Sequence, residues 1–135
     1  MPNSPITVKR IDHVTLVVKN LNVSRSFYVD LLGMEEVSRP GFRFPGMWFQ
    51  AGTTQIHLIE EHAESGPSQT SVPENCTISR THHFAFEVDN AHESAEVLKS
   101  QGIEIQAGPK SRPDGPTQLY IFDPDSNLVE LFSYS

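Results

Sequence analysis

Four side chains that can bind a metal ion stand in similar sequence surroundings along this chain. His13, His57, His83 and Glu130 each lie in a short run rich in β-branched and other apolar residues. Burying an ionisable group among apolar neighbours is costly unless the group is paired or bound to a metal. Three imidazoles and one carboxylate suit a divalent ion such as Mn, Fe, Co, Ni or Zn. We therefore predict that these four residues are metal ligands.

The histidines occupy matching places in an internal repeat. Each copy opens with a β-branched run that carries His13 or His83, and continues into an amphipathic segment that ends at Gly33 or Gly102. A glycine at this point is typical of the left-handed residue that ends a helix. The repeat predicts two similar half-modules in one domain, with module 1 at about 9–60, a linker at 61–79 and module 2 at about 80–134.

Each copy is predicted to have the order β-α-β-β-β. In the first copy, Asn20 or Asn22 can cap the helix, and Val23, Phe27 and Leu31 give it an apolar stripe. The strands are expected at 9–18, 34–38, 47–51 and 54–60, with a loop at 40–45.

In the second copy, Asn90 and Glu93 form a plausible capping box, and Ala91, Ala95 and Leu98 are expected to face inward. The strands are expected at 83–88, 103–106, 117–122 and 128–132, with a loop at 108–115 and a turn at 123–127. Residues 61–79 are polar and show no periodicity, which indicates a linker or an active-site lid.

The alternation of side chains along a strand predicts which residues share a face with the candidate ligands, because successive side chains point to opposite faces. Trp48 and Phe49 must face opposite ways, so one is expected to line a cavity and the other to pack under a helix. Arg112, in the loop before a strand, could meet an anionic substrate. The residues predicted to bind substrate are Thr15, Gln55, Trp48, Gln118, Tyr120 and Arg112.

Composition excludes several classes of partner. A net charge of -7 in 135 residues argues against nucleic acid and anionic membrane surfaces, since both attract clustered Lys and Arg. No apolar run approaches the roughly 20 residues of a membrane span, and the N-terminus lacks the features of a secretory signal. The lone cysteine, Cys76, cannot form an internal disulfide, so a reducing cytoplasm is the expected location.

The motifs resemble those of the vicinal oxygen chelate superfamily, the glyoxalase, bleomycin-resistance and extradiol-dioxygenase group. The similar stretches are His-Val-Thr-Leu-Val-Val at 13–18, Phe-Tyr-Val-Asp-Leu-Leu-Gly-Met at 27–34 and Phe-Asp-Pro-Asp-Ser-Asn-Leu-Val-Glu-Leu at 122–131. The resemblance implies an α+β fold in which two βαβββ modules form an eight-stranded cup, and a homodimer. It also implies that the ligands come from the first and last strand of each module, as His13, His57, His83 and Glu130 would.

For function, the resemblance implies a metal-dependent, glyoxalase-like lyase or isomerase acting on a small oxygen-chelating substrate, with Glu130 as the catalytic base. The chain departs from bacterial-type glyoxalase I in having His57 where that group has a glutamate. Two alternatives stay open. One is an extradiol-type dioxygenase or a fosfomycin-type thiol transferase or hydrolase, and the other is a drug-binding protein without catalysis, like the bleomycin-resistance members.

Overall fold

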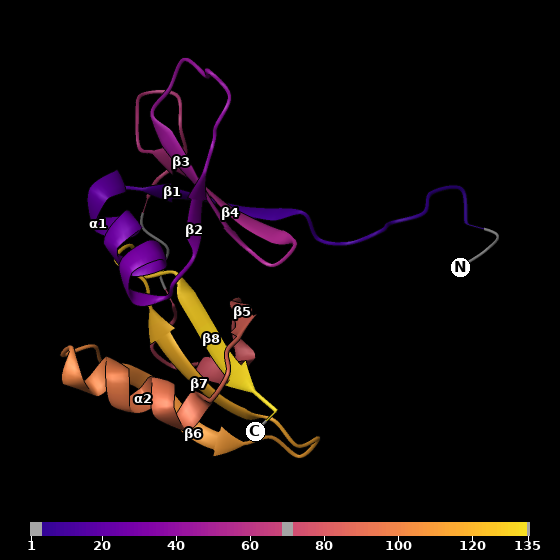
Figure 1. Cartoon of the computed structure of the whole chain (residues 1–135), viewed down its shortest axis with the longest axis vertical. Coiled ribbons are helices and arrows are strands. Elements are labelled where there is room, and N and C mark those ends of the chain that lie inside the picture. The colour runs from indigo at the N-terminus through magenta and orange to yellow at the C-terminus, as the bar shows by residue number, and fades with distance from the viewer. Residues whose placement is uncertain (1–3, 69–71, 135) are drawn as a thin grey trace. The chain divides into compact units, whose positions relative to one another are not determined.

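The computed structural model describes residues 4–68 and 72–134, and it contains one topology twice (Figure 1). The chain divides into two compact units, Met1–Ser68 and Gln69–Ser135. The boundary falls inside the predicted linker at 61–79, of which residues 69–71 lie outside the described residues. Each unit contains helices and one four-stranded mixed sheet, which confirms the predicted α+β class and the two β-α-β-β-β modules.

The first unit has the strand order β1-β4-β3-β2. The β1 and β4 strands are parallel, whereas β4 with β3 and β3 with β2 are antiparallel. The elements are β1 (His13–Val18), α1 (Leu21–Arg25), the π-helix η1 (Ser26–Leu31), β2 (Glu35–Val37), β3 (Gly46–Ala51) and β4 (Thr54–Glu60).

The helical segment of the first unit begins and ends where predicted, but its buried stripe differs. The Asn20 side chain accepts a hydrogen bond from the Val23 amide at 3.0 Å, and Gly33 ends the segment with a φ of 76°. Val23, placed on the buried stripe by the sequence, is 51% exposed, while Ser24 is fully buried. The wider turn of the π-helix changes the phase of the segment, so a strict spacing of four residues does not describe its buried face.

The core of the first unit lies between its helices and one face of the sheet. Phe49, Ile56 and Leu58 of this face are at most 1% exposed, and the fully buried Tyr28 ring lies 6.1 Å from the Phe49 ring. Burying one face of the sheet leaves the opposite face to present side chains to a ligand, because neighbouring residues of a strand alternate between faces.

The first strand is shorter than predicted. β1 begins at His13, where its pairing with Gln55 of β4 begins, and the expected strand residues 9–12 form no ladder. Ile6, Val8 and Ile11 are more than 70% exposed in the segment that precedes β1. β-branched composition alone therefore placed the start of this strand too early, because a strand also needs a partner.

The second unit repeats the order, as β5-β8-β7-β6, with a parallel pair between β5 and β8. Its elements are the 3₁₀-helix η2 (Ile78–Arg80), β5 (Phe84–Glu87), α2 (Ala91–Ser100), β6 (Ile105–Ser111), β7 (Thr117–Phe122) and β8 (Leu128–Ser133).

The α2 helix agrees with its prediction. Asn90 caps it by accepting a hydrogen bond from the Glu93 amide at 3.0 Å. Ala91, Ala95 and Leu98 are at most 2% exposed, as the periodicity predicted. The predicted turn after β7 is also present, where Asp123 Oδ1 accepts hydrogen bonds from two backbone amides.

The predicted loop at 108–115 is partly strand. β6 continues to Ser111 through a cis Gly108–Pro109 peptide, and its register against β7 shifts between Ala107 and Lys110. Gly108 has a φ of 83°, and a Cβ there would lie 2.4 Å from the Gln118 carbonyl oxygen. Glycine and proline at this point form an irregularity inside a strand rather than ending it.

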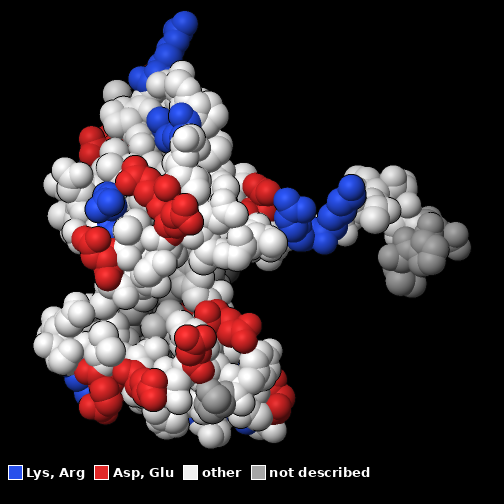
Figure 2. All heavy atoms as spheres, viewed as in Figure 1, with Lys and Arg blue, Asp and Glu red and all other residues white. Residues whose placement is uncertain are grey.

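Charge differs between the two units, because the first carries 7 acidic and 6 basic residues and the second carries 10 acidic and 4 basic residues. Figure 2 shows several groups of acidic side chains on each unit, with basic side chains in smaller groups, as the net charge of -7 requires. Within residues 4–68 and 72–134, every helix is too short or too polar to cross a membrane.

Candidate functional site

The face of the first sheet that is turned away from α1 and η1 carries both candidate ligands of this unit. Paired residues of neighbouring strands share a face, so the register of β1, β4 and β3 arranges this face in three rows. The rows are His13, Gln55 and Gln50; Thr15, His57 and Trp48; and Val17, Ile59 and Gly46. We call these nine residues the site face of the first sheet.

Three aromatic rings stack across this face. The His57 imidazole lies between the His13 ring, at 4.0 Å between centroids, and the Trp48 indole, at 3.9 Å. The planes differ by 13° and 3°. Trp48 thus lines the site face while Phe49 packs under the helices. Partial burial and the charge of His13 hold the pKa of His57 below its usual value.

A chain of amide hydrogen bonds determines which nitrogen of His57 holds the proton. The Gln50 Nε2 donates to the Gly52 carbonyl at 2.9 Å, and Gln50 Oε1 accepts from Gln55 Nε2 at 3.1 Å. Gln55 Oε1 therefore faces His57 Nε2, at 2.7 Å. Since a backbone carbonyl can only accept, the direction of the chain requires that Nε2 donate, and Nδ1 keeps its lone pair.

One ring nitrogen of His13 is likewise bound to an acceptor side chain. Its Nδ1 lies 2.9 Å from Asp12 Oδ2, and this hydrogen bond is the main reason that the pKa of Asp12 lies below its usual value. A carboxylate accepts, so His13 Nδ1 donates and Nε2 keeps its lone pair. The His13 side chain is 40% exposed and can turn toward a ligand.

The second unit places His83 and Glu130 in contact. His83 Nε2 lies 3.0 Å from Glu130 Oε1, and His83 Nδ1 lies 2.8 Å from the Thr81 carbonyl oxygen. His83 Nδ1–H donates to this carbonyl, so the neutral imidazole presents the lone pair of Nε2 to the carboxylate. Two such groups repel unless a cation lies between them, and that cation can be a proton or a metal ion.

Two further side chains contact the Glu130 carboxylate, which is 7% exposed. The Tyr120 hydroxyl donates to Oε1 at 3.2 Å, and burial together with the charge of Glu130 raises the pKa of Tyr120 to about 12. Arg112 Nη1 lies 3.9 Å from Oε2, which is an ion pair but too long for a hydrogen bond. Glu130 Oε2 is buried without a hydrogen-bond partner, so this oxygen has the Arg112 charge nearby but no donor bound to it.

The register of the second sheet repeats that of the first. Ala85, Glu130 and Tyr120 stand side by side on β5, β8 and β7, as Thr15, His57 and Trp48 do on β1, β4 and β3. The correspondence of His57 with Glu130, which the sequence predicted, is therefore a structural one.

A cavity of about 110 Å³ lies beside Tyr120 in the second unit. It is bounded by η2, β6 and β7, and its polar lining includes Ser79, Lys110 and Gln118. Gln118 and Tyr120, predicted to bind substrate, thus share one cavity. Arg112 is not among its lining residues, and its guanidinium makes a bidentate ion pair with Asp114.

The predicted metal ligands come together as two pairs, His13 with His57 and His83 with Glu130. Among the described residues, no three His, Cys, Asp or Glu side chains gather in an arrangement that could hold a metal ion. Sequence reasoning missed the roles of Asp12 and Gln50, whose contacts with the site depend on geometry and strand register rather than on any motif.

Comparison with known proteins gives one family. The model described as the Glyoxalase/Bleomycin resistance protein/Dioxygenase superfamily matches residues 10–131. Among curated relatives, glyoxylase I 4 of Arabidopsis thaliana is 24% identical over 95% of this chain and 72% of its own length. Metapyrocatechase of Geobacillus stearothermophilus is 27% identical over 97% of this chain, which spans 39% of that longer enzyme.

Solved structures show the same likeness. A glyoxalase family protein from Bacillus anthracis has a TM-score of 0.73 and 28% identity, with 98% of this chain and 100% of that one covered. The fosfomycin resistance protein FosX from Listeria monocytogenes has a TM-score of 0.71 and 24% identity over 93% of this chain and 91% of its own. The latter likeness concerns the fold alone.

Proposed function

Because the chain belongs to the glyoxalase, bleomycin resistance protein and dioxygenase superfamily, we propose that it is a divalent-metal-dependent enzyme of the glyoxalase-like lyase or isomerase type. Its substrate would be a small molecule that presents two neighbouring oxygen atoms. A relative described as a glyoxylase, which matches 95% of this chain, supports this choice of reaction.

The contact between His83 and Glu130 is the observation on which this proposal rests. The Thr81 carbonyl holds the proton of His83 on Nδ1, and the other ring nitrogen faces Glu130 Oε1 at 3.0 Å. Metal-binding histidines typically donate their second nitrogen to a carbonyl or carboxylate in this way. The buried Glu130 Oε2, which accepts no hydrogen bond, adds a further acceptor for a cation. The donor set therefore fits Mn, Fe, Co, Ni or Zn.

Each residue of this pair has a definite part in the proposed reaction. A bound divalent ion would supply Lewis-acid polarisation of the substrate oxygens. Glu130 is the proposed base, and it would take a proton from the carbon next to the polarised group and return it to the neighbouring carbon. Tyr120, which stays protonated near neutral pH, would hold the carboxylate through its hydroxyl.

His13 and His57 remain predicted ligands of the same ion. Each has one ring nitrogen bound to an acceptor and keeps a lone pair on the other. The two rings are stacked face to face in this structure. The lone pair of an imidazole nitrogen lies in the plane of its ring, so at least one ring would have to rotate before both nitrogens could bind one ion. This ring rotation is part of the proposal.

Metal analysis of the purified protein tests the proposal. We expect close to one divalent ion per chain after incubation with Mn, Ni or Zn and removal of excess metal. His83→Ala and Glu130→Ala should weaken metal binding at least about tenfold. His92→Ala, an exposed histidine of α2, is the matched control and should bind metal as the parent does. Equal metal binding by all variants would rule out the His83–Glu130 site.

Activity assays with the metal-loaded protein then separate the possible reactions. Turnover of a thiol-hemiacetal of a 2-oxoaldehyde is expected. Oxygen uptake with catechols, or adduct formation between a thiol and an epoxide, would instead assign the protein to the dioxygenase or fosfomycin-type branch. Metal binding without any turnover would favour a binding protein.

A further inference from the structure

Arg39 lies on the site face of the first sheet, in the segment between β2 and β3. The position follows from Gly46, which shares a face with Trp48 because the two are separated by one residue of β3. A Cβ on Gly46 would stand 2.8 Å from both Cζ and Nε of Arg39. The guanidinium therefore occupies the place of a missing side chain, beside Ile59, the cross-strand partner of Gly46.

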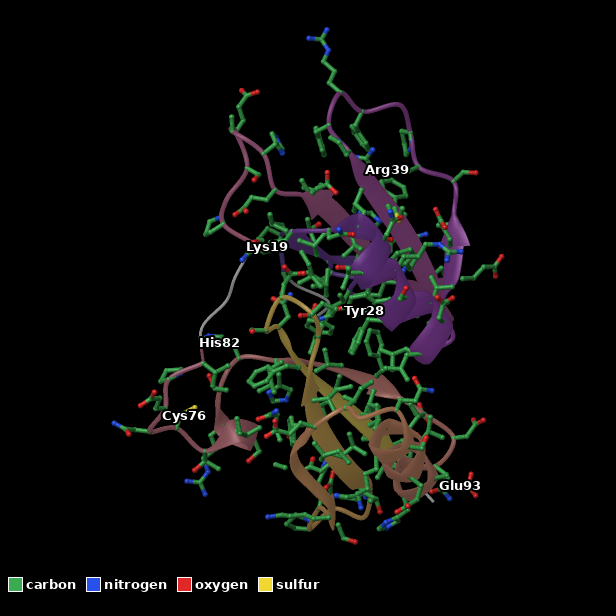
Figure 3. The ribbon with its side chains drawn as sticks, turned by 90° about the vertical axis from the view of Figure 1, so that its left-hand side faces the viewer. Lys19, Tyr28, Arg39, Cys76, His82 and Glu93 are labelled. Carbon is green, nitrogen blue, oxygen red and sulfur yellow. The ribbon has the colours of Figure 1, made fainter. Side chains whose placement is uncertain are left out.

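The guanidinium is held there by aromatic rings. Arg39 Cζ lies 4.8 Å from the centroid of the Phe42 ring and 5.0 Å from that of Phe44. The two rings stack on each other at 5.4 Å, and Phe44 in turn stacks on His62 at 5.6 Å. Cation–π contacts of this kind fix the orientation of a guanidinium but use none of its N–H donors. Figure 3 shows Arg39 among side chains close to a strand of the first unit.

The charge of Arg39 is not balanced within the described part of the chain. No carboxylate described there lies within ion-pair distance of its side chain, although acidic residues outnumber basic ones by 17 to 10. By contrast, Arg10, Arg25 and Arg112 each contact an aspartate or glutamate. The Arg39 Nε is buried without a hydrogen-bond partner, so the guanidinium has a donor that no described group uses.

We propose that Arg39 is the recognition residue of a binding site for a small organic carboxylate on the site face of the first sheet. The planar guanidinium matches a carboxylate with two parallel hydrogen bonds. Val17 and Ile59 occupy the same row of the site face, and Trp48 stands in the next row. The body of the ligand that continues from the carboxylate is therefore apolar or aromatic. Arg39 is half-buried rather than fully buried, so a ligand can reach its side chain from solvent.

Fluorescence of Trp48, the single tryptophan, reports on this face directly. Metal-free protein is titrated with benzoate and, separately, with benzamide, which has the same shape but no charge. We expect saturable binding of benzoate and at least tenfold weaker binding of benzamide, because hydrogen bonds between two charged groups are stronger than those to a neutral amide. Equal affinities for the two compounds would overturn the proposal.

Substitutions of Arg39 test whether this residue binds the carboxylate. Arg39→Gln should weaken benzoate binding at least about tenfold and leave benzamide binding unchanged. Arg39→Lys, which keeps the charge but lacks the planar fork, should bind benzoate with intermediate affinity. Arg43→Gln removes an exposed cation from the same loop and should bind as the parent does. Unchanged benzoate binding by Arg39→Gln, or an equal loss in Arg43→Gln, would contradict the proposal.

A second measurement covers the case in which Arg39→Gln does not fold, which thermal unfolding would reveal. In the parent protein, the Arg39 Nε–H NMR signal, assigned by its absence in Arg39→Lys, should shift with benzoate and stay in place with benzamide. No shift with benzoate would refute the site. These experiments need neither metal nor turnover, so they can fail while the proposed metal function holds, and the reverse is also true.

Discussion

The three histidines of the candidate site differ in the kind of acceptor that binds one ring nitrogen. His83 donates to the Thr81 carbonyl, His13 to the Asp12 carboxylate and His57 to the Gln55 amide. A carbonyl or carboxylate can only accept, whereas an amide can turn and offer its NH₂ group instead. The proton position on His57 therefore depends on the residue that orients Gln55, and that residue is Gln50.

Replacing Gln55 should change the tautomer of His57. In Gln55→Ala the acceptor at Nε2 is lost, so the neutral imidazole should populate both tautomers instead of the Nε2–H form alone. Nitrogen NMR shifts of His57 in metal-free protein measure the tautomer ratio. Gln118→Ala, in the second unit, is the control and should leave these shifts unchanged. An unaltered ratio in Gln55→Ala would show that the amide chain does not determine the tautomer.

Tyr120 should ionise at a higher pH than an ordinary tyrosine. Its pKa is raised to about 12, so the folded state holds a proton that the unfolded chain, with a pKa near 10, releases. Stability should therefore fall as pH rises from about 10 to 12. Tyr120→Phe should lack this part of the loss, as measured by unfolding with urea across that range. If the free energy of unfolding fell equally with pH in both proteins, Tyr120 would not be the cause. Absorbance at 295 nm measures the ionisation of the tyrosine directly.

At the scale of elements, the helices are defined by side chains at their ends. Asn20 and Asn90 accept hydrogen bonds from the third following amide, and Gly33 and Gly102 take positive φ values of 76° and 72°. Amides in the first turn of a helix have no partner within it, and an asparagine side chain supplies one. The repeat is therefore preserved in its capping residues as well as in its histidines.

Loss of either cap should destabilise the fold by a similar amount. Asn20→Ala and Asn90→Ala are each expected to lower the free energy of unfolding by about 1 kcal/mol, measured in urea. Asn75→Ala, an exposed asparagine outside any helix, should change it by less than about 0.5 kcal/mol. A loss of the same size in Asn75→Ala would mean that capping is not the cause.

At the scale of the whole molecule, the chain consists of two units with the same strand order and separate cores. Each core lies on the helix side of its sheet, and the candidate ligands lie on the other side of each sheet. The main apolar core and the candidate ligands therefore lie on opposite faces of each sheet, although Glu130 is itself buried. The homodimer stays a prediction, and sedimentation analysis of the purified protein tests it.

Metal binding should be visible in the stability of the molecule. An ion that binds the folded state alone stabilises it by about 2.7 kcal/mol when its free concentration is a hundred times the Kd. We expect Mn or Ni chloride to raise the Tm of the parent protein and to leave that of Glu130→Ala unchanged. A calcium salt serves as the control for ionic strength. An equal rise in Glu130→Ala would show that the ion binds elsewhere.

The order of the elements, both helix ends and the two-module class follow from the sequence by itself. These features depend on local chemistry: glycine for a positive φ, asparagine for a cap, and alternating apolar residues for a half-buried strand. The same signals placed Trp48 opposite Phe49 and matched His57 with Glu130. These local signals gave the wrong strand bounds where pairing with a neighbouring strand sets the bound, as at the start of β1 and in the glycine–proline stretch of β6.

The tertiary structure alone decided which side chains meet. The stack of His13, His57 and Trp48 results from the register of three strands, and no local pattern encodes register. The guanidinium of Arg39 lies over Gly46 because Arg39 follows Val37 by two residues and Gly46 precedes Trp48, the antiparallel partner of Val37, by two. Hydrogen bonds and ion pairs act over a few ångströms, so residues distant in sequence become a site only when the packed core brings their strands together.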